Sequence, residues 1–103
     1  MKVVIGSDHA GYALKSIVSE HLKEKGYDVI DKGVHEATRC DYPDFAFPVA
    51  KSVANQDAVW GILVCGTGIG MSMSANKVPG IRAAVVSDPF CAAATRQHNN
   101  ANI

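Results

Sequence analysis

Residues 60–77 read Trp60-Gly61-Ile62-Leu63-Val64-Cys65-Gly66-Thr67-Gly68-Ile69-Gly70-Met71-Ser72-Met73-Ser74-Ala75-Asn76-Lys77, and our fold prediction starts from this stretch. The run from Trp60 to Val64 is apolar and of strand length, which is typical of a strand covered on both faces. Three glycines then alternate with Thr67 and Ile69, and residues 71–77 are helix formers and small residues. The stretch predicts a buried strand, a glycine-rich turn and a helix.

A turn of this kind is suited to binding an anion. Several backbone N–H groups point at one spot, and the positive end of the helix dipole lies behind them. Glycines let a ligand approach the backbone and allow positive φ angles. Cys65 and Thr67 border the same spot, so a thiol and a hydroxyl would share a pocket with amides that stabilise an oxyanion.

The composition indicates a single small domain over residues 1–103. Lys and Arg number 10, as do Asp and Glu, so we expect no nucleic-acid or membrane partner but a small molecule or another protein chain. The three cysteines, Cys40, Cys65 and Cys91, show no C-x-x-C spacing, which disfavours a disulfide framework or a structural zinc site. A reducing compartment fits, and the amino-terminal residues are too short an apolar run for a signal peptide, so we expect a cytoplasmic protein.

Strand and helix patterns alternate along the chain. Strands are predicted at residues 3–5, 27–31, 60–64 and 82–86, and helices at 11–25, from Asp41 onward, at 71–77 and at 87–97. Because Pro48 is awkward inside a helix, we expect the second helix to be kinked or to begin nearer Phe45. Residues 101–103 look like the first residues of a further strand.

The first helix pattern predicts which residues face the core. Leu14, Ile17, Val18 and Leu22 recur at helical spacing, while Lys15 falls on the polar face. The alternation as a whole predicts an α/β fold, a three-layer Rossmann-like domain with a mainly parallel sheet whose final strand and helix are missing or incomplete.

Polar residues follow the predicted strands, and parallel strands end at one edge of the sheet. Asp8 and His9 follow the first strand, residues 65–70 follow the third, and Ser87 and Asp88 follow the fourth. Ligands of such sheets gather at this edge. We therefore expect the binding site there.

Several readings of these residues stay open. The glycine turn lacks the lysine of a P-loop and fits a dinucleotide fingerprint poorly. Cys65 could be a small buried apolar residue, but it ends its strand next to a helix N-terminus, which favours a thiolate. His9 and His98 each end an element beside a polar group and are acid–base or anion-contact candidates. A metal site from Asp8, His9, Cys65 and His98 is conceivable, yet no pair has i, i+4 spacing.

Five blocks of sequence, in this order, resemble the ribose-5-phosphate isomerase B family, which also includes the subunits of galactose-6-phosphate isomerase. The blocks are Gly6-Ser7-Asp8-His9-Ala10-Gly11, Asp41-Tyr42-Pro43, Val64-Cys65-Gly66-Thr67-Gly68-Ile69-Gly70, residues 75–83 (Ala75 to Ala83) and residues 96–102 (Arg96 to Asn102). The resemblance runs the length of the chain. It implies an aldose–ketose isomerase that needs no metal or cofactor and passes through a cis-enediol.

The resemblance also implies a role for each matching residue. Cys65 would move the proton between C2 and C1 of the sugar, and Thr67 would help move a proton between O1 and O2. The amides of Gly66, Thr67, Gly68, Ile69 and Gly70 would hold the enediolate charge. His98 and Asp8 would open the sugar ring and bind hydroxyls, His9 would contact the phosphate, Asn99 would bind a hydroxyl, and Tyr42 would form a pocket wall.

Family members continue past residue 103 with the rest of a strand and at least one helix that carries phosphate-binding arginines and helps pair two subunits. We therefore expect this chain to be truncated at its carboxyl end. The predicted reaction is the interconversion of ribose 5-phosphate and ribulose 5-phosphate in a homodimer, or a dimer of dimers, with sites shared between subunits. The alternatives are isomerisation of a six-carbon sugar phosphate, and a non-catalytic phosphate- or nucleotide-binding module.

Overall fold

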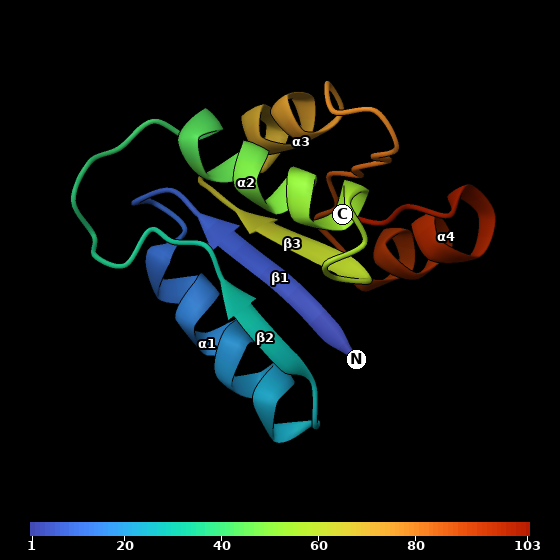
Figure 1. Ribbon diagram of the computed structural model, residues 1–103, viewed down its shortest axis with the longest axis horizontal. Helices are drawn as coiled ribbons and strands as arrows, with labels where there is room; N and C mark the ends of the chain where they lie inside the picture. The colour runs from blue at the N-terminus through green and yellow to red at the C-terminus, as the bar shows by residue number, and fades with distance from the viewer.

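A parallel three-stranded sheet forms the centre of the computed structural model, which describes residues 1–103 (Figure 1). The central strand is β1 (Lys2–Ser7), with β2 (Asp28–Asp31) on one side and β3 (Trp60–Val64) on the other. Both pairs run parallel, and the register sets Ser7 opposite Val64. The strands predicted from the first three apolar runs are confirmed.

Helices cover both faces of this sheet. α1 (Tyr12–Glu24) packs against all three strands, whereas α2 (Pro43–Ala54) packs against β1, β3 and α3 (Ile69–Ala75). α4 (Pro89–Asn99) lies beyond β3, apart from the other helices (Figure 1). The predicted α/β architecture is therefore confirmed. No helix combines the length and the apolar character that crossing a membrane requires.

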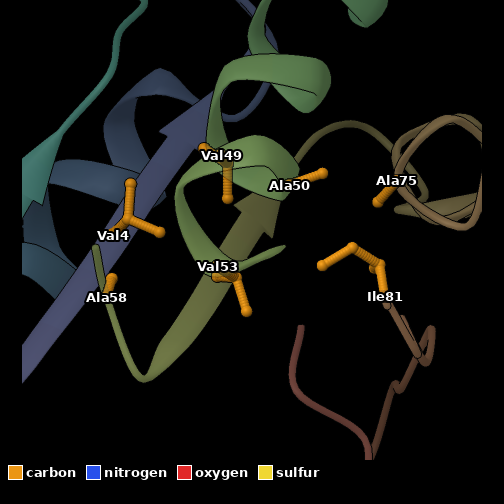
Figure 2. Close-up of a cluster of buried hydrophobic side chains, with 7 residues drawn as sticks. All are labelled: Val4, Val49, Ala50, Val53, Ala58, Ala75 and Ile81. Atoms are coloured by element: carbon orange, nitrogen blue, oxygen red, sulfur yellow. The ribbon is translucent and has the colours of Figure 1, made fainter. Parts of the chain in front are cut away.

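The main apolar core lies between the sheet and α2 (Figure 2). Seven buried residues form it: Val4, Val49, Ala50, Val53, Ala58, Ala75 and Ile81. Two strand glycines allow this close packing, because a Cβ at Gly6 would lie 2.8 Å from Val49 Cγ2 and one at Gly61 would lie 3.0 Å from Val49 Cγ1. The helix could not approach the sheet as closely over larger side chains.

Our prediction of which face of α1 is buried is wrong in part. Lys15 is only 1% exposed, whereas Leu14 and Ile17 are 54% and 68% exposed. The ammonium group of Lys15 pairs with Asp31 Oδ1 at 2.8 Å and also donates to the Val34 carbonyl. These partners lie far away in sequence, so helical periodicity could not reveal that a charged side chain occupies an inward position.

The fourth predicted strand, residues 82–86, is also wrong as a regular strand. The segment has no contact with β3 through backbone hydrogen bonds; instead Arg82 and Ala84 bond to Asn102 and Ile103. The alternative start of the second helix near Phe45 is wrong as well, because α2 begins at Pro43 and continues through Pro48. The final helix is confirmed, with Asp88 as its N-cap.

Among the glycines, Gly11 leaves the least room for a side chain, and this generates a stability prediction. A Cβ at Gly11 would lie 2.3 Å from the carbonyl oxygen of Val64, although the φ of Gly11, −92°, would suit any residue. We expect Gly11→Ala to lower the free energy of unfolding by roughly 3 kcal/mol, because the turn and β3 must move apart. Urea unfolding followed by circular dichroism measures this change.

Gly66→Ala is the matched control, since a Cβ at Gly66 meets no atom within 4 Å. Its unfolding free energy should stay within roughly 0.5 kcal/mol of the original value. Equal effects of the two substitutions would show that the contact with Val64 is not what requires glycine at position 11.

Candidate active site

The turn that follows β3 holds Cys65 and Thr67 through its own backbone. The amide of Gly68 donates to Cys65 Sγ at 2.9 Å, and the amide of Ile69 donates to Thr67 Oγ1 at 3.1 Å. Gly68 has a φ of +80°, in the left-handed region that favours glycine. Both side chains act as acceptors here, so the sulfur lies where negative charge is stabilised and the Thr67 hydroxyl hydrogen remains free to donate.

Three other amides of this turn are open to a ligand. Those of Gly66, Thr67 and Gly70 have no partner within the chain. A Cβ at Gly66 would touch nothing within 4 Å, so the backbone faces open space there. Of the five amides in the predicted cradle over residues 66–70, three are therefore unpaired within the chain, while the other two position Cys65 and Thr67.

Tyr42 forms a wall beside the same turn. A Cβ at Gly70 would lie 2.7 Å from Cζ of the Tyr42 ring, so the ring lies directly over the glycine backbone. Tyr42 precedes α2 and is 42% exposed. The absence of a side chain at position 70 thus allows the ring to pack onto the turn.

Asp8 lies next to the strand end that carries Cys65. Its amide donates to the Val64 carbonyl at 3.3 Å, and its Oδ1 accepts a hydrogen bond from the Gly11 amide at 3.0 Å. Asp8 is 9% exposed. The close approach of Gly11 to Val64 fixes this turn against β3, so the two turns form one surface. The only side-chain hydrogen bond of Asp8 uses Oδ1, and Oδ2 has no partner in the chain.

His9 is held in one orientation by the loop before α2. Its Nδ1 accepts a hydrogen bond from the Cys40 amide at 3.3 Å, and Cys40 Sγ lies 4.0 Å from the same nitrogen. A ring nitrogen that accepts from an amide carries no hydrogen, so we assign the hydrogen to Nε2. The sequence did not predict this contact, because no local pattern links two positions 31 residues apart.

Lys15 supports this surface from beneath. Asp31 Oδ1, its ion-pair partner, also accepts from the Gly33 amide at 2.8 Å. Gly33 and Val34 in turn bond to Ser7, through the Ser7 amide at 2.7 Å and the Ser7 carbonyl at 3.0 Å. Lys15 therefore helps to hold Gly33 and Val34, which bond to the end of β1 directly before Asp8. No sequence pattern indicated this role.

His98 and Asn99 do not reach the glycine turn of their own chain. They end α4, two and three residues after Arg96, whose guanidinium lies 5.3 Å from the ring centroid of Trp60. Trp60 begins β3 and Cys65 follows its other end, which is roughly 13 Å from the start of a strand of this length. Within one chain the structure therefore brings together the predicted residues from β1, α2 and β3, but not those from α4.

Asp88 and Cys91 interact at the start of α4. Asp88 Oδ1 accepts a hydrogen bond from the Cys91 amide at 2.8 Å, and this bond lowers the pKa of the carboxyl group. The nearby carboxylate raises the pKa of the Cys91 thiol. Asp88 is thus occupied as a helix cap, and Cys91 is a poorer nucleophile at neutral pH than an ordinary exposed thiol.

A cavity of about 330 Å³ opens beside the glycine turn. Its lining includes Cys65, Gly66, Thr67 and Gly68, together with apolar residues of β3, α1 and residues 83–86. No three of the histidine, cysteine, aspartate and glutamate side chains are grouped as a metal ion would need. The polar groups that border this cavity are the thiol of Cys65, the hydroxyl of Thr67 and the backbone of the turn, whereas Asp8, His9 and Tyr42 lie outside its lining. A thiol and a hydroxyl beside unpaired amides suit proton transfer near an oxyanion.

Comparison with known proteins identifies relatives of this chain. Ribose-5-phosphate isomerase B from Escherichia coli (strain K12) is 49% identical over 102 residues, which cover 99% of this chain and 68% of the relative. The structure of the Clostridium thermocellum ribose-5-phosphate isomerase B matches with a TM-score of 0.99 and 52% identity, covering 100% of this chain and 70% of that one.

A structure of ribose-5-phosphate isomerase B from Mycoplasma genitalium with bound ribulose-5-phosphate matches with a TM-score of 0.92 and 52% identity. The match covers 98% of this chain and 68% of that chain. The family model described as Ribose/Galactose Isomerase matches residues 3–103. On the strength of the model and of these relatives, the chain belongs to the ribose/galactose isomerase family.

Proposed function

We propose that this protein is an aldose–ketose isomerase that interconverts ribose 5-phosphate and ribulose 5-phosphate. The observation that carries the proposal is the turn after β3, where Cys65 Sγ accepts from the Gly68 amide at 2.9 Å beside Thr67 and three free amides. Relatives that are 49–52% identical to this chain carry the name ribose-5-phosphate isomerase B, and the structure of one of them contains ribulose-5-phosphate.

Each group of the turn has a step in the reaction. As a thiolate, Cys65 removes the proton from C2 of the open-chain aldose, and the resulting thiol returns it to C1 of the cis-enediol. The Thr67 hydroxyl carries a proton from O2 to O1, which completes the change from aldose to ketose. The amides of Gly66, Thr67 and Gly70 stabilise the negative oxygen of the enediolate, which is a large contribution in sites of this type.

The turn after β1 serves the rest of the sugar phosphate. Asp8 binds a hydroxyl through its unpaired Oδ2 and assists opening of the ring. His9 donates from Nε2 to the phosphate, because Cys40 occupies its Nδ1. Tyr42 limits the pocket on the α2 side. The cytoplasm suits this enzyme, since all three cysteines are free thiols.

We infer that two subunits complete each site. His98 and Asn99 lie at the opposite end of β3 from Cys65 in their own chain, so we assign these roles to His98 and Asn99 of the partner subunit in a homodimer. A two-fold axis would give each protomer's turn the α4 end of the other protomer, and so two equal sites.

The first prediction concerns the proton carrier. Cys65→Ala should lower kcat for ribose 5-phosphate by about 10³-fold or more while binding is retained, because the base is lost and the rest of the pocket stays. Cys91→Ala is the control, since Cys91 is exposed and caps no part of this turn. Conversion is followed by the appearance of ribulose 5-phosphate, and binding by calorimetry; an unsubstituted chain that binds ribose 5-phosphate without converting it, or a Cys65→Ala chain that converts it at the original rate, would contradict the proposal.

The second prediction concerns the shared site. Cys65→Ala and His98→Asn chains should each be inactive, and their mixture after subunit exchange should regain about a quarter of the original activity, because half of the dimers are mixed and each has one intact site. Mixing Cys65→Ala with Thr67→Ala should restore nothing, since both changes fall in the same turn. Recovery in the control mixture, or none in the first, would rule out sharing.

The third prediction concerns the reactivity of the thiols. Near pH 7 Cys65 should be alkylated faster than Cys40 and Cys91, and ribose 5-phosphate should protect Cys65 alone. Because the carboxylate of Asp88 raises the pKa of Cys91, that thiol is deprotonated only at higher pH, and Asp88→Asn should speed its alkylation at pH 7. Mass spectrometry of each cysteine peptide over time measures the rates; an unchanged Cys91 rate in Asp88→Asn would show that the carboxylate has no such effect.

A further inference from the structure

A loop of residues 32–42 joins β2 to α2 and bonds to the end of β1 (Figure 1). The Ser7 amide donates to the Gly33 carbonyl at 2.7 Å, and the Val34 amide donates to the Ser7 carbonyl at 3.0 Å. The hydroxyl of Ser7 is buried and has no hydrogen-bond partner in the chain. Ser7 is therefore held through its backbone, and the start of the loop helps to determine where the turn after β1 (residues 8–11) begins.

The far end of the same loop reaches a side chain of that turn. The Cys40 amide donates to Nδ1 of His9 at 3.3 Å, and the ring of Tyr42 lies over the backbone of Gly70. Residues 35–39 between the two attached ends are exposed and make no backbone hydrogen bond. Because nothing else holds the middle of the loop, its position depends on how firmly its two ends are held.

Lys15 holds the start of the loop from inside the protein. Its ammonium group donates to Asp31 Oδ1 at 2.8 Å and to the Val34 carbonyl, and Asp31 Oδ1 also accepts from the Gly33 amide at 2.8 Å. The side chain of Lys15 is 1% exposed, whereas that of Asp31 is 35% exposed. The backbone amide of Lys15 donates to the Gly11 carbonyl at 2.8 Å. One residue therefore joins the end of the turn to the start of the loop.

Stability alone does not account for a buried ammonium group at this position. Removing the charge of Lys15 from water is costly, and a well-packed apolar pair in place of a buried ion pair is often as stable or more so. An apolar side chain cannot, however, donate in two directions at once. Lys15 does so, toward the Asp31 carboxylate and the Val34 carbonyl, and this fixes the geometry of the loop start.

We propose that Lys15 is a positioning residue of the isomerase site, which acts through the loop to orient Asp8 and His9 and touches no substrate itself. This inference rests on the proposed function, in which His9 contacts the phosphate and Asp8 assists opening of the ring. The turn after β3 does not depend on Lys15, since amides of that turn hold Cys65 and Thr67. Loss of Lys15 should therefore impair the handling of the sugar phosphate and leave the thiol as reactive as before.

Lys15→Met, which removes the donors and keeps an unbranched side chain, tests the proposal. The kcat/KM for ribose 5-phosphate should fall at least about thirtyfold, because a displacement of about 1 Å in a site can cost about a hundredfold. Alkylation of Cys65 at pH 7 should stay within about twofold of the original rate. Lys23→Met is the matched control and should change neither value, because the ion pair of Lys23 with Glu20, at 3.5 Å on the same helix, is exposed.

Two results of these measurements would overturn the proposal. The first is a Lys15→Met chain whose kcat/KM stays within about threefold of the original value, since a displaced site costs more than that. The second is a loss of Cys65 reactivity in parallel with the loss of turnover, which would show that the substitution disturbs the whole fold.

A double variant separates positioning from stability. In Lys15→Met/Asp31→Leu neither charge is left without its partner, so the free energy of unfolding should recover. The kcat/KM should remain low, because no side chain then bonds to the Gly33 amide and the Val34 carbonyl. Recovery of activity together with stability would show that Lys15 only stabilises the fold, and would overturn the proposal.

NMR of the His9 ring and of the Cys40 amide gives a readout that does not depend on turnover. In Lys15→Met the ring nitrogen resonances should shift, and the Cys40 amide should exchange at least about tenfold faster, because its bond to Nδ1 is loosened. Unchanged resonances and exchange would overturn the proposal. If the unsubstituted chain does not convert ribose 5-phosphate, the proposed function is wrong, and this readout alone decides whether Lys15 orients His9.

Discussion

The parallel pairing of β1 with β3 sets Ser7 opposite Val64, and the candidate site depends on this register. The two strands end level with each other, so the turns that follow them must share one surface. A hydrogen bond from the Asp8 amide to the Val64 carbonyl joins these turns, and the bare backbone of Gly11 lets them touch. A slip of the register would separate the carboxylate from the thiol and would also turn the core side chains of β3 to the wrong face.

Lys15 shows how a buried charge can position a site that it does not touch. Removing an ammonium group from water is costly unless strong partners replace the water, and the Asp31 carboxylate and the Val34 carbonyl do so here. Such a pair contributes little net stability. Moving one partner away is nevertheless costly, because the other charge would be left buried and unpaired. The Lys15–Asp31 ion pair therefore determines where Gly33 and Val34, which bond to Ser7, must lie. This in turn fixes the turn of Asp8 and His9.

Much of the fold could be predicted because its signals are local. The strand-length apolar runs and the helix pattern at residues 87–97 each depend on a few neighbouring residues, and the structure confirms the first three strands and the final helix. Where the outcome depends on distant partners, the sequence was insufficient. The inward position of Lys15 depends on Asp31 and Val34, and the pairing of His9 depends on Cys40, neither of which any periodicity encodes.

The glycine turn was recognisable for the same reason, because Cys65, Thr67 and their amides lie within one short segment. Which amides remain free was not predictable, since that depends on how Gly68 and Ile69 turn toward the two side chains. The position of His98 was equally hidden, because it is set by the packing of α4 beside the start of β3. The sequence block of residues 96–102 therefore did not reveal at which end of the sheet His98 lies.

The failed prediction of a strand at residues 82–86 has a physical cause. A β-strand is defined by its partner, and the apolar sequence of this segment has a partner only at Arg82 and Ala84, where Asn102 and Ile103 lie. Residues 83–86 nevertheless form one wall of the cavity that borders Cys65 and Thr67. Exclusion of water from this side of the turn would strengthen the electrostatic effect of its amides on a developing oxyanion.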